Sequence, residues 1–373
     1  MKQIIFLSII LIFSSCAGKK KQTEKTIQGK IVTISDAKGF SIEHTRNYAI
    51  VTVNNPWKTG SIYDRYYLVK NDTVATPTDG QKVLIPLKSL MVNSATHLGF
   101  LKLLGELDKV TGVSNPYYIY DSNILKRVKE GKIKTLGDSF NLDIENLLLL
   151  HPQAVMTTAY NAEDENSKRM KKTGLTLLYD IEWQEPTLLG RAEWIKFIAA
   201  FFDKENLANT IYAQIRKKYE DLKKLSLSVK KRPTVFSGQD YRGTWHMAGG
   251  KSYTAQLFKD AGANYYYAND STATSIPGTI EEALVLFNQT DIWIGVEANS
   301  LKELGKANDK YKYFKAYKNK EVFNTNKRKN NSGGNDYWET GVARPDLLLS
   351  DMIKICHPDL LPDYTLTFYE QLK

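Results

Sequence analysis

The spacing of apolar residues predicts a long amphipathic helix near the middle of the chain. No Gly or Pro occurs between Asp203 and Leu225, and apolar residues recur there every three or four positions, as on one face of an α-helix. The apolar positions are Leu207, Ile211, Ile215, Tyr219, Leu222 and Leu225. Such a helix runs about 35 Å at 1.5 Å per residue. We expect a spine between two lobes, with a separate helix at 190–202 leading into it; a surface helix of one large domain is the alternative.

Helix and strand patterns alternate on both sides of this helix. Helical segments separated by short apolar strands extend from His97 to Tyr179, and the same alternation restarts at Thr234. This alternation is typical of parallel sheets with crossover helices. We therefore predict an α/β fold of two lobes with central, mainly parallel sheets, joined by a single long helix, with a ligand cleft between the lobes. Two terminal helices are expected, at 345–355 and at 364–372.

Residues 28–92 have a different pattern from the rest of the chain. Short apolar or alternating runs are separated by turns rich in Gly, Pro and Asn, which predicts a β-rich segment. We assign the N-terminal lobe to 28–186, with a β-rich extension at 28–92. Linker helices occupy 187–230, with the interlobe spine at 203–225, and the C-terminal lobe occupies 231–373.

The first residues are typical of an export signal. Met1-Lys2 precedes an apolar run from Ile4 to Phe13, and Ser14-Ser15-Cys16 follows. The run is shorter than the roughly 20 residues of a membrane-spanning helix, and its end resembles a bacterial lipobox. We expect a signal peptide at 1–15, a lipidated Cys16 and a polar leash at 16–27, which would anchor a periplasm-facing protein to a bacterial membrane of the cell envelope. A plain signal peptide that contains a cysteine is the alternative.

Composition and motifs exclude several classes of function. The net charge of +10 is spread along the chain, whereas a nucleic-acid-binding protein concentrates Lys and Arg on one face. If Cys16 is acylated, Cys356 has no partner for an intramolecular disulfide. No nucleophile elbow, phosphate loop or His/Cys cluster at metal-site spacing occurs. We expect neither an enzyme nor a resident cofactor or metal.

Four segments, in the same order, resemble class III periplasmic substrate-binding proteins of ABC importers, the helical-backbone metal receptor type. These segments are 142–155, 190–197, 245–263 and 344–358. The resemblance as a whole covers residues 85–373. One departure from the family pattern is Gln153, which stands where the family usually has Asp. The family serves importers of ferric siderophores, haem and cobalamin. The resemblance implies a monomeric lipoprotein that captures a chelated iron compound, ferric siderophore or haem, between its lobes and delivers it to an ABC permease and its ATPase. A cobalamin- or corrinoid-binding protein of this class and a non-transport periplasmic scaffold or sensor with the same fold are the alternatives.

The ligand cleft is expected at loops that follow the carboxyl ends of strands. Aromatic rings supply contact area for large chelates and macrocycles, and Arg pairs with their anionic groups. The candidate ligand-binding residues are Thr96, His97, Tyr117, Tyr118, Tyr160, Tyr241, Arg242, Trp245, His246 and Trp338. Trp57 and residues 63–67 of the β-rich segment are candidates for the rim, although strand packing also explains Tyr66 and Tyr67.

The resemblance also implies one exposed carboxylate on each lobe that meets Arg residues of the permease. The matching positions are Glu163 in the first lobe and Glu281 in the second. Acidic residues in the first turn of a helix also stabilise it through the helix dipole, so a structural role is the alternative for both.

Overall fold

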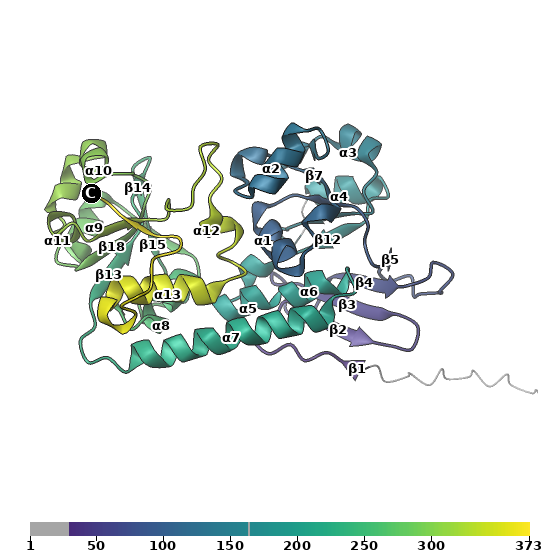
Figure 1. The fold of residues 1–373 in the computed structure, drawn as a ribbon, viewed down its shortest axis with the longest axis horizontal. Helices are drawn as coiled ribbons and strands as arrows, with labels where there is room; N and C mark the ends of the chain where they lie inside the picture. The colour runs from purple at the N-terminus through teal and green to yellow at the C-terminus, as the bar shows by residue number, and fades with distance from the viewer. Residues whose placement is uncertain (1–29, 163–164) are drawn as a thin grey trace, which may run out of the picture.

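The computed structural model describes residues 30–162 and 165–373, which form two α/β lobes, a β-rich extension and a long connecting helix (Figure 1). The predicted signal peptide, Cys16, the leash and Glu163 lie outside the described residues.

The first lobe is built on a parallel five-stranded sheet. Its order is β12 (Leu177–Tyr179), β11 (Ala154–Thr157), β6 (Leu90–Val92), β7 (Val110–Val113) and β8 (Lys134–Thr135). Its helices are α1 (Ala95–Leu104), α2 (Ser122–Lys129), α3 (Ile144–Leu150) and α4 (Glu165–Lys172), with a small hairpin of β9 (Gly137–Asp138) and β10 (Asn141–Leu142). Apart from β8, whose two residues are exposed at the edge of the sheet, the strands are mostly apolar and buried. Helices cover both faces of such a sheet.

The second lobe repeats this arrangement. Its main sheet has the order β16 (Asn264–Tyr265), β13 (Thr234–Ser237), β18 (Ile292–Val296), β19 (Val322–Asn324) and β20 (Glu370–Gln371), and only the β19–β20 pairing is antiparallel. A second, antiparallel sheet contains β14 (Asp240–Tyr241), β15 (Thr244–Ala248) and β17 (Ser275–Gly278). The helices are α8 (Tyr253–Asp260), α9 (Ile280–Phe287), α10 (Leu301–Ala307), α11 (Lys315–Lys318), α12 (Asp336–Glu339) and α13 (Pro345–Cys356).

The β-rich extension forms a sheet of its own. Its strands are β1 (Lys30–Ile31), β2 (Phe40–His44), β3 (Ala49–Asn54), β4 (Ile62–Val69) and β5 (Gln81–Leu84), in chain order, and only β4 and β5 are parallel neighbours. Because β6 lies inside the parallel sheet of the first lobe, the extension ends before Leu90 and not at residue 92.

Two buried carboxylates attach the extension to the linker helices. Glu193, fully buried in α5 (Leu188–Glu193), accepts backbone hydrogen bonds from residues 35–37 at 2.6–3.0 Å and pairs with Lys196 at 2.7 Å. Glu185 accepts from the backbone of residues 38 and 39 and from the indole nitrogen of Trp194. These bonds satisfy the amides of a loop that has no strand partner, so the extension and the linker pack as one unit.

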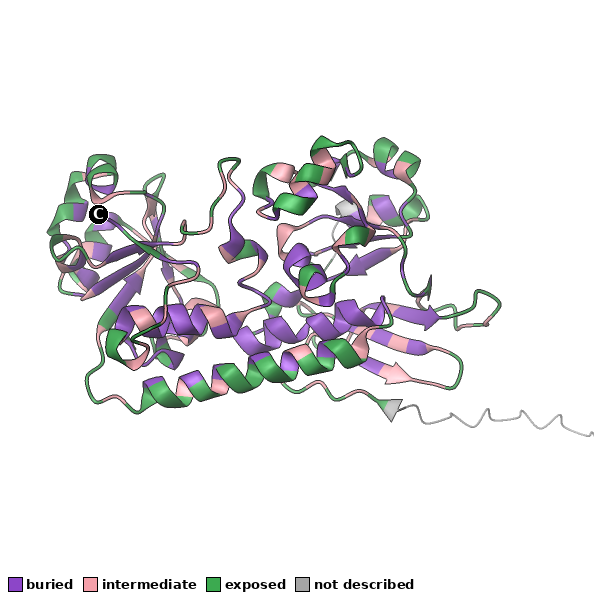
Figure 2. Cartoon of the chain, in the orientation of Figure 1, coloured by how far each residue is buried: buried purple, intermediate pink, exposed green. Residues whose placement is uncertain are grey.

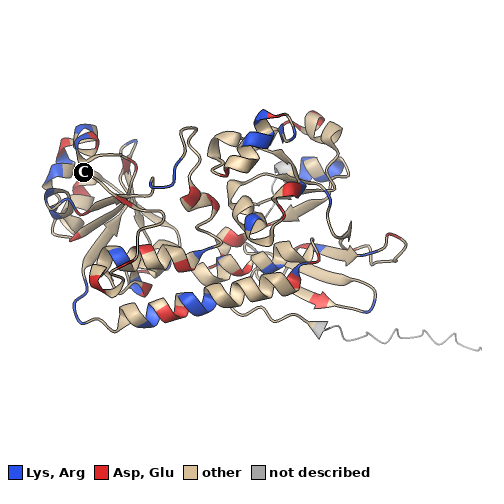
Figure 3. Cartoon of the chain, in the orientation of Figure 1, with Lys and Arg blue, Asp and Glu red and all other residues tan. Residues whose placement is uncertain are grey.

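The predicted spine is confirmed as α7 (Glu205–Leu227), a 23-residue helix that runs along both lobes. Tyr212 belongs to the hydrophobic core of the first lobe, whereas Tyr219 and Leu222 belong to the core of the second. The hydroxyl of Tyr219 donates to Asp260 of α8 at 2.7 Å. The outer face of α7 is exposed (Figure 2) and carries mixed charges, including the Lys217–Asp221 pair (Figure 3).

The buried stripe of α7 differs in part from the prediction. It comprises Ala208, Tyr212, Ile215, Tyr219, Leu222 and Ser226. Leu207 and Leu225 are 42% and 38% exposed. Polar anchors explain the difference, because the hydroxyl of Tyr212 donates to Asp36 and that of Ser226 to the backbone of Asp260. The leading helix expected at 190–202 is two short helices, α5 and α6 (Ile195–Ala200).

The predicted last helix, at 364–372, is wrong. Residues 364–373 are extended, and β20 pairs with β19. The cause is Asp351, a fully buried residue of α13, whose carboxylate accepts backbone hydrogen bonds from residues 367–369 at 2.7–3.1 Å. A helix would direct these amides into its own turns. The other terminal helix is confirmed as α13.

Candidate ligand-binding cleft

One cavity lies between the lobes, a second lies within the second lobe, and the two share one side chain, that of Trp338. The first cavity, of about 220 Å³, is lined by first-lobe residues 92–96, 98, 113–115, 118, 119, 139, 158 and 160, and by 333, 335 and 338 from the second lobe. The second cavity, of about 390 Å³, is lined by the second lobe alone and includes His246, Tyr253 and Tyr337. Trp338 follows the start of α12 and is 50% exposed. The two cavities therefore form one cleft with Trp338 in its wall.

The floor of the first cavity lies at the carboxyl ends of β6 and β7. In an open parallel sheet, ligands bind in this position because the following loops diverge there. The amide of Asn93 donates to the hydroxyl of Thr157 at 3.1 Å and to the carbonyl of Ser139 at 3.0 Å, and Ser114 donates to the carbonyl of Asn93 at 3.1 Å. These bonds hold the floor in a fixed shape.

Five of the predicted residues line the cleft. Thr96, Tyr118 and Tyr160 line the first cavity, His246 lines the second, and Trp338 lines both. Tyr118 and Tyr160 are 59% and 52% exposed, so their rings are accessible to a ligand. The cleft combines aromatic faces with short polar side chains.

Trp245 and His97 do not line the cleft. Trp245 is fully buried and stacks at 5.6 Å on Trp293 in the second-lobe core. Successive side chains of a strand point to opposite faces, so Trp245 and the exposed His246 of β15 cannot both face the ligand. His97 is 1% exposed, its Nε2 lies 3.8 Å from Asp180, and burial lowers its pKa to about 3. Both residues are structural.

Three further candidates lie away from the cavity walls. Tyr241 and Arg242 form the tip of the β14–β15 hairpin, where Arg242 and Gly243 both have positive φ (54° and 86°), as a two-residue type I′ turn requires. The guanidinium of Arg242 lies over the Tyr241 ring at 5.2 Å. Tyr117 packs against Tyr118 at 5.1 Å and lines neither cavity.

A second-lobe segment, residues 327–343, contacts the first lobe directly and closes one side of the cleft; we call it the interlobe latch. The side-chain amide of Asn330 donates to the carbonyl of Ile119 at 2.9 Å. Glu339 accepts from the backbone of Tyr120 at 2.7 Å and of Asp121 at 3.2 Å. A Cβ atom on Gly334 would lie 1.9 Å from the Ile119 carbonyl, so this approach requires glycine. The latch and α7 together connect the lobes on two sides.

The latch contains a titratable group. Burial, together with the nearby carboxylates of Asp121 and Asp336, raises the pKa of Glu339 to about 7, although the two backbone hydrogen bonds oppose the shift. Lys102 and Arg328 partly offset these charges, because they pair with Asp121 and Asp336 at 2.8 and 3.0 Å. The charge of Glu339 therefore changes near neutral pH.

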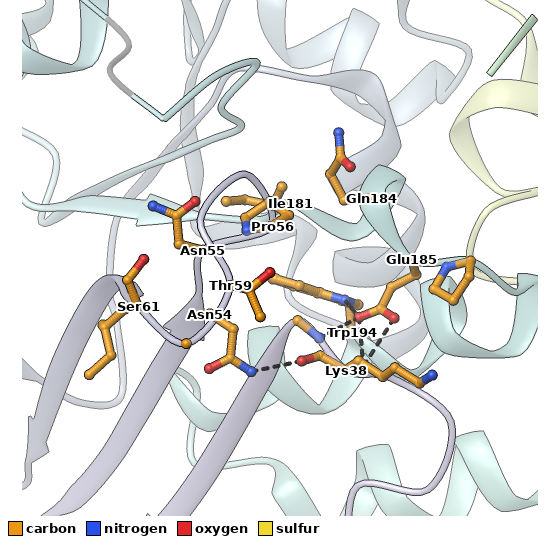
Figure 4. A pocket seen from close by; sticks show the side chains of 14 residues that line it. Lys38, Asn54, Asn55, Pro56, Thr59, Ser61, Ile181, Gln184, Glu185 and Trp194 are labelled. Atoms are coloured by element: carbon orange, nitrogen blue, oxygen red, sulfur yellow. Dashed lines mark hydrogen bonds between the residues drawn. The ribbon is translucent and has the colours of Figure 1, made fainter. Parts of the chain in front are cut away.

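A third cavity, of about 640 Å³, lies between the extension and the start of the linker helices (Figure 4). The β3–β4 loop, Ile181, Gln184 and Pro186 line it. Glu185 and Trp194 also line it, but they are bonded to each other and to the 38–39 backbone. The polar groups at its base are therefore engaged in structure.

Metal-ligating side chains are dispersed within residues 30–162 and 165–373. No group of three or more His, Cys, Asp or Glu residues in this part of the chain could hold a metal ion.

A family profile described as periplasmic binding protein matches residues 92–328 of the chain. The chain belongs to this family. The matched segment begins after the β-rich extension.

Similar proteins agree with this assignment. An uncharacterized lipoprotein of Methanocaldococcus jannaschii is 25% identical over 95% of this chain and 92% of its own length. A possible iron-binding periplasmic solute-binding protein of Staphylococcus epidermidis has a similar structure, with a TM-score of 0.56 and 18% identity over 72% of this chain and 98% of that protein. The vitamin B12-binding protein BtuF of Vibrio cholerae has a TM-score of 0.52 and 15% identity over 72% and 96%. The fold is that of class III periplasmic binding proteins.

The cleft of this periplasmic binding protein also contains residues that the sequence analysis did not select. Asn115, Asn335 and Tyr253 line its walls. Asn115 and Asn335 each cap a short helix, a position where Asn is common for purely structural reasons. Tyr253 begins α8 directly after its N-cap Ser252. Its position at the start of a helix is the sequence feature that could have indicated it as a cleft residue.

Replacing Glu339 by Gln should change the pH dependence of stability. The folded-state pKa of about 7 exceeds the ordinary value of 4.5, so the stabilisation from the protonated acid is complete below pH 4.5 and is lost as pH rises through 7. Gln keeps a carbonyl oxygen for the Tyr120 amide and cannot ionise. Above pH 8, Glu339→Gln should be more stable than the wild type by about 1–3 kcal/mol, and near pH 5 the two should be equal.

Urea unfolding between pH 5 and pH 8.5 measures this difference. Glu145→Gln, an exposed position in α3, is the matched control and should follow the wild type throughout. Parallel pH curves for Glu339→Gln and the wild type would contradict the prediction.

Proposed function

We propose that this protein is the substrate-binding lipoprotein of an ABC importer, and that it captures a chelated iron compound, a ferric siderophore or haem, in the interlobe cleft and delivers it to the membrane permease. The observation that carries the proposal is Trp338, which lines cavities on both sides of the cleft. A ligand that contacts this ring in the first cavity touches both lobes at once.

The lining of the cleft suits a large, flat ligand. Three exposed rings, Tyr118, Tyr160 and Trp338, line the first cavity from both lobes. Aromatic rings provide wide contact area with little loss of side-chain entropy, and short polar groups orient the ligand. The Ser, Thr and Asn side chains at the ends of β6 and β7 supply such groups.

The choice of iron over a corrinoid rests on the exposed phenols of Tyr118 and Tyr160. Tyrosine oxygen is a known ligand of ferric iron in haem proteins, and a ferric chelate accepts phenol contacts at its anionic edge. The similar structures include one possible iron-binding and one vitamin B12-binding protein, and fold similarity at this level does not select between them. A corrinoid ligand is the second candidate.

The location of the protein is proposed from its N-terminus and its relatives. Cys16 ends a lipobox-like signal, and the Methanocaldococcus jannaschii relative is named a lipoprotein. Within the described residues, no helix is both long and apolar enough to cross a membrane. We propose attachment to the cell envelope through the lipid on Cys16.

Two neighbouring carboxylates in the first turn of α9, Glu281 and Glu282, are available for permease docking on the second lobe. Glu282 completes a capping box with Thr279 at the start of α9, with hydrogen bonds of 2.7 and 3.2 Å. Glu281 points to solvent, its side chain is 61% exposed, and it pairs with Lys310. An exposed ion pair is worth little, so an Arg of the permease could replace Lys310. We propose Glu281 for docking in this lobe and Glu163 in the first.

Titration of the purified protein with haemin, ferric siderophores and cyanocobalamin, followed by visible absorbance, tests the ligand. We expect micromolar or tighter binding of a ferric compound, and Trp338→Ala should weaken it about tenfold or more, since loss of a buried aromatic contact costs about 1.4 kcal/mol or more. Tyr313→Ala removes an exposed ring that lines neither cavity and is the control. Binding of cyanocobalamin alone would identify the ligand as a corrinoid instead of an iron compound. Binding of none of the three would favour a scaffold or sensor.

Reversing the charge at both Glu163 and Glu281 to Lys tests delivery. We expect the double variant to bind its ligand as the wild type does but to lose uptake into cells, because Lys would repel the Arg residues of a permease. Glu145→Lys is the control for an exposed charge reversal on the same protein. Unchanged uptake by the double variant would reject the docking assignment.

A further inference from the structure

Four aromatic rings form a continuous row from the cleft onto the β-rich extension. Phe140 and Tyr160 lie 5.0 Å apart between ring centroids, Tyr160 and Trp183 5.8 Å, and Trp183 and Trp57 6.4 Å. The first three rings are tilted by only 34–36° from one to the next. We call these four residues the aromatic row.

The row is exposed at the cleft end. Phe140 is 64%, Tyr160 52% and Trp183 38% exposed, and Trp57 is half-buried. An apolar surface of this kind on a soluble protein usually marks a binding site. Trp57 packs in part against the first-lobe core, but the row is less buried than Tyr66 and Tyr67, the rings that pack fully within the extension.

Hydrogen bonds hold the ring of Trp183 and the backbone of Trp57 in fixed positions. The indole nitrogen of Trp183 donates to the hydroxyl of Thr158 at 3.1 Å and to the carbonyl of Ala159 at 3.2 Å. Trp57 lies in the β3–β4 loop, where the side chain of Asn55 accepts from the backbone of Trp57 at 3.0 Å and of Lys58 at 3.1 Å. A ring that is already ordered loses little entropy when a ligand stacks on it.

The row is continuous with the proposed ligand site. Tyr160 belongs to the row and also lines the first cleft cavity, as does Thr158, which anchors Trp183. The cavity measures only about 220 Å³. Sites that enclose a whole ligand typically measure about 300–1,000 Å³, so this cavity is smaller than most of them. A larger ligand that enters this cavity must extend beyond it, and both the second cavity at Trp338 and the row at Tyr160 adjoin it.

We propose that the β-rich extension is part of the ligand site, and that the aromatic row, with Trp57 at its far end, binds a planar conjugated part of the ligand that protrudes from the cleft. This inference rests on the proposed function. It assigns the ligand to chelates that carry flat rings, such as a porphyrin or the aryl rings of a catecholate, and it gives the extension, which lies outside the family match, a role in selectivity.

Titration of three probes tests the proposal: haemin, a ferric triscatecholate and a ferric trihydroxamate, which has no aromatic ring. Trp57→Ala should weaken binding of the ring-bearing probes about three- to tenfold, in the range of one aromatic contact, and should leave the trihydroxamate unchanged. Trp57→Phe should restore most of the affinity. Trp57→Leu, which preserves apolar volume without a ring, replaces Trp57→Ala if that variant does not fold.

The outcomes separate the inference from the function on which it rests. Equal affinity of Trp57→Ala and the wild type for a ring-bearing probe would overturn the inference but not the proposed function. The same holds if the wild type binds the trihydroxamate but neither ring-bearing probe. An equal loss for all three probes would show a structural effect and would also overturn it. Failure of the wild type to bind any of the three would overturn the iron function, and the inference with it.

Discussion

The arrangement of the lobes depends on one constraint, which is that α5 and α7 each contribute to both hydrophobic cores. Leu188 and Leu189 of α5 pack in the second lobe while Ala192 of the same helix packs in the first. A helix cannot bend sharply without losing backbone hydrogen bonds. Rotation of one lobe against the other must therefore break apolar contacts in at least one core. The latch adds polar contacts across the cleft, so the ligand meets a site that is largely formed in advance.

Much of the fold could be predicted because it depends on local periodicity. The α7 helix, the strand–helix alternation and the two lobes follow from apolar spacing, since burial of one face is the main determinant of these elements. The failed prediction at 364–372 has a non-local cause, because the amides there bond to Asp351. Local helix propensity could not reveal a partner 16 residues away.

The site could be predicted only in part. The segments after β6, β7 and β11 could be predicted because parallel strands end at the same edge, and these segments contain Thr96, Tyr118 and Tyr160. Trp245 was selected for its residue type, although the alternation of β15 excludes it once His246 faces the cleft. The Glu339–Tyr120 hydrogen bond joins residues 219 positions apart, and the aromatic row joins Trp57 to Trp183. Such pairings arise from tertiary structure and leave no local pattern.

The most direct test of a preformed cleft is the distance between the lobes with and without ligand. Spin labels at Lys129→Cys in α2 and Lys306→Cys in α10 occupy exposed positions on opposite lobes, and the native Cys356 is buried. Pulsed electron resonance then gives the interlobe distance distribution. The account predicts a shift of less than about 2 Å on saturation with the bound chelate, as in pre-organised complexes. A closure of several ångströms would show that α7 and the latch do not fix the lobes.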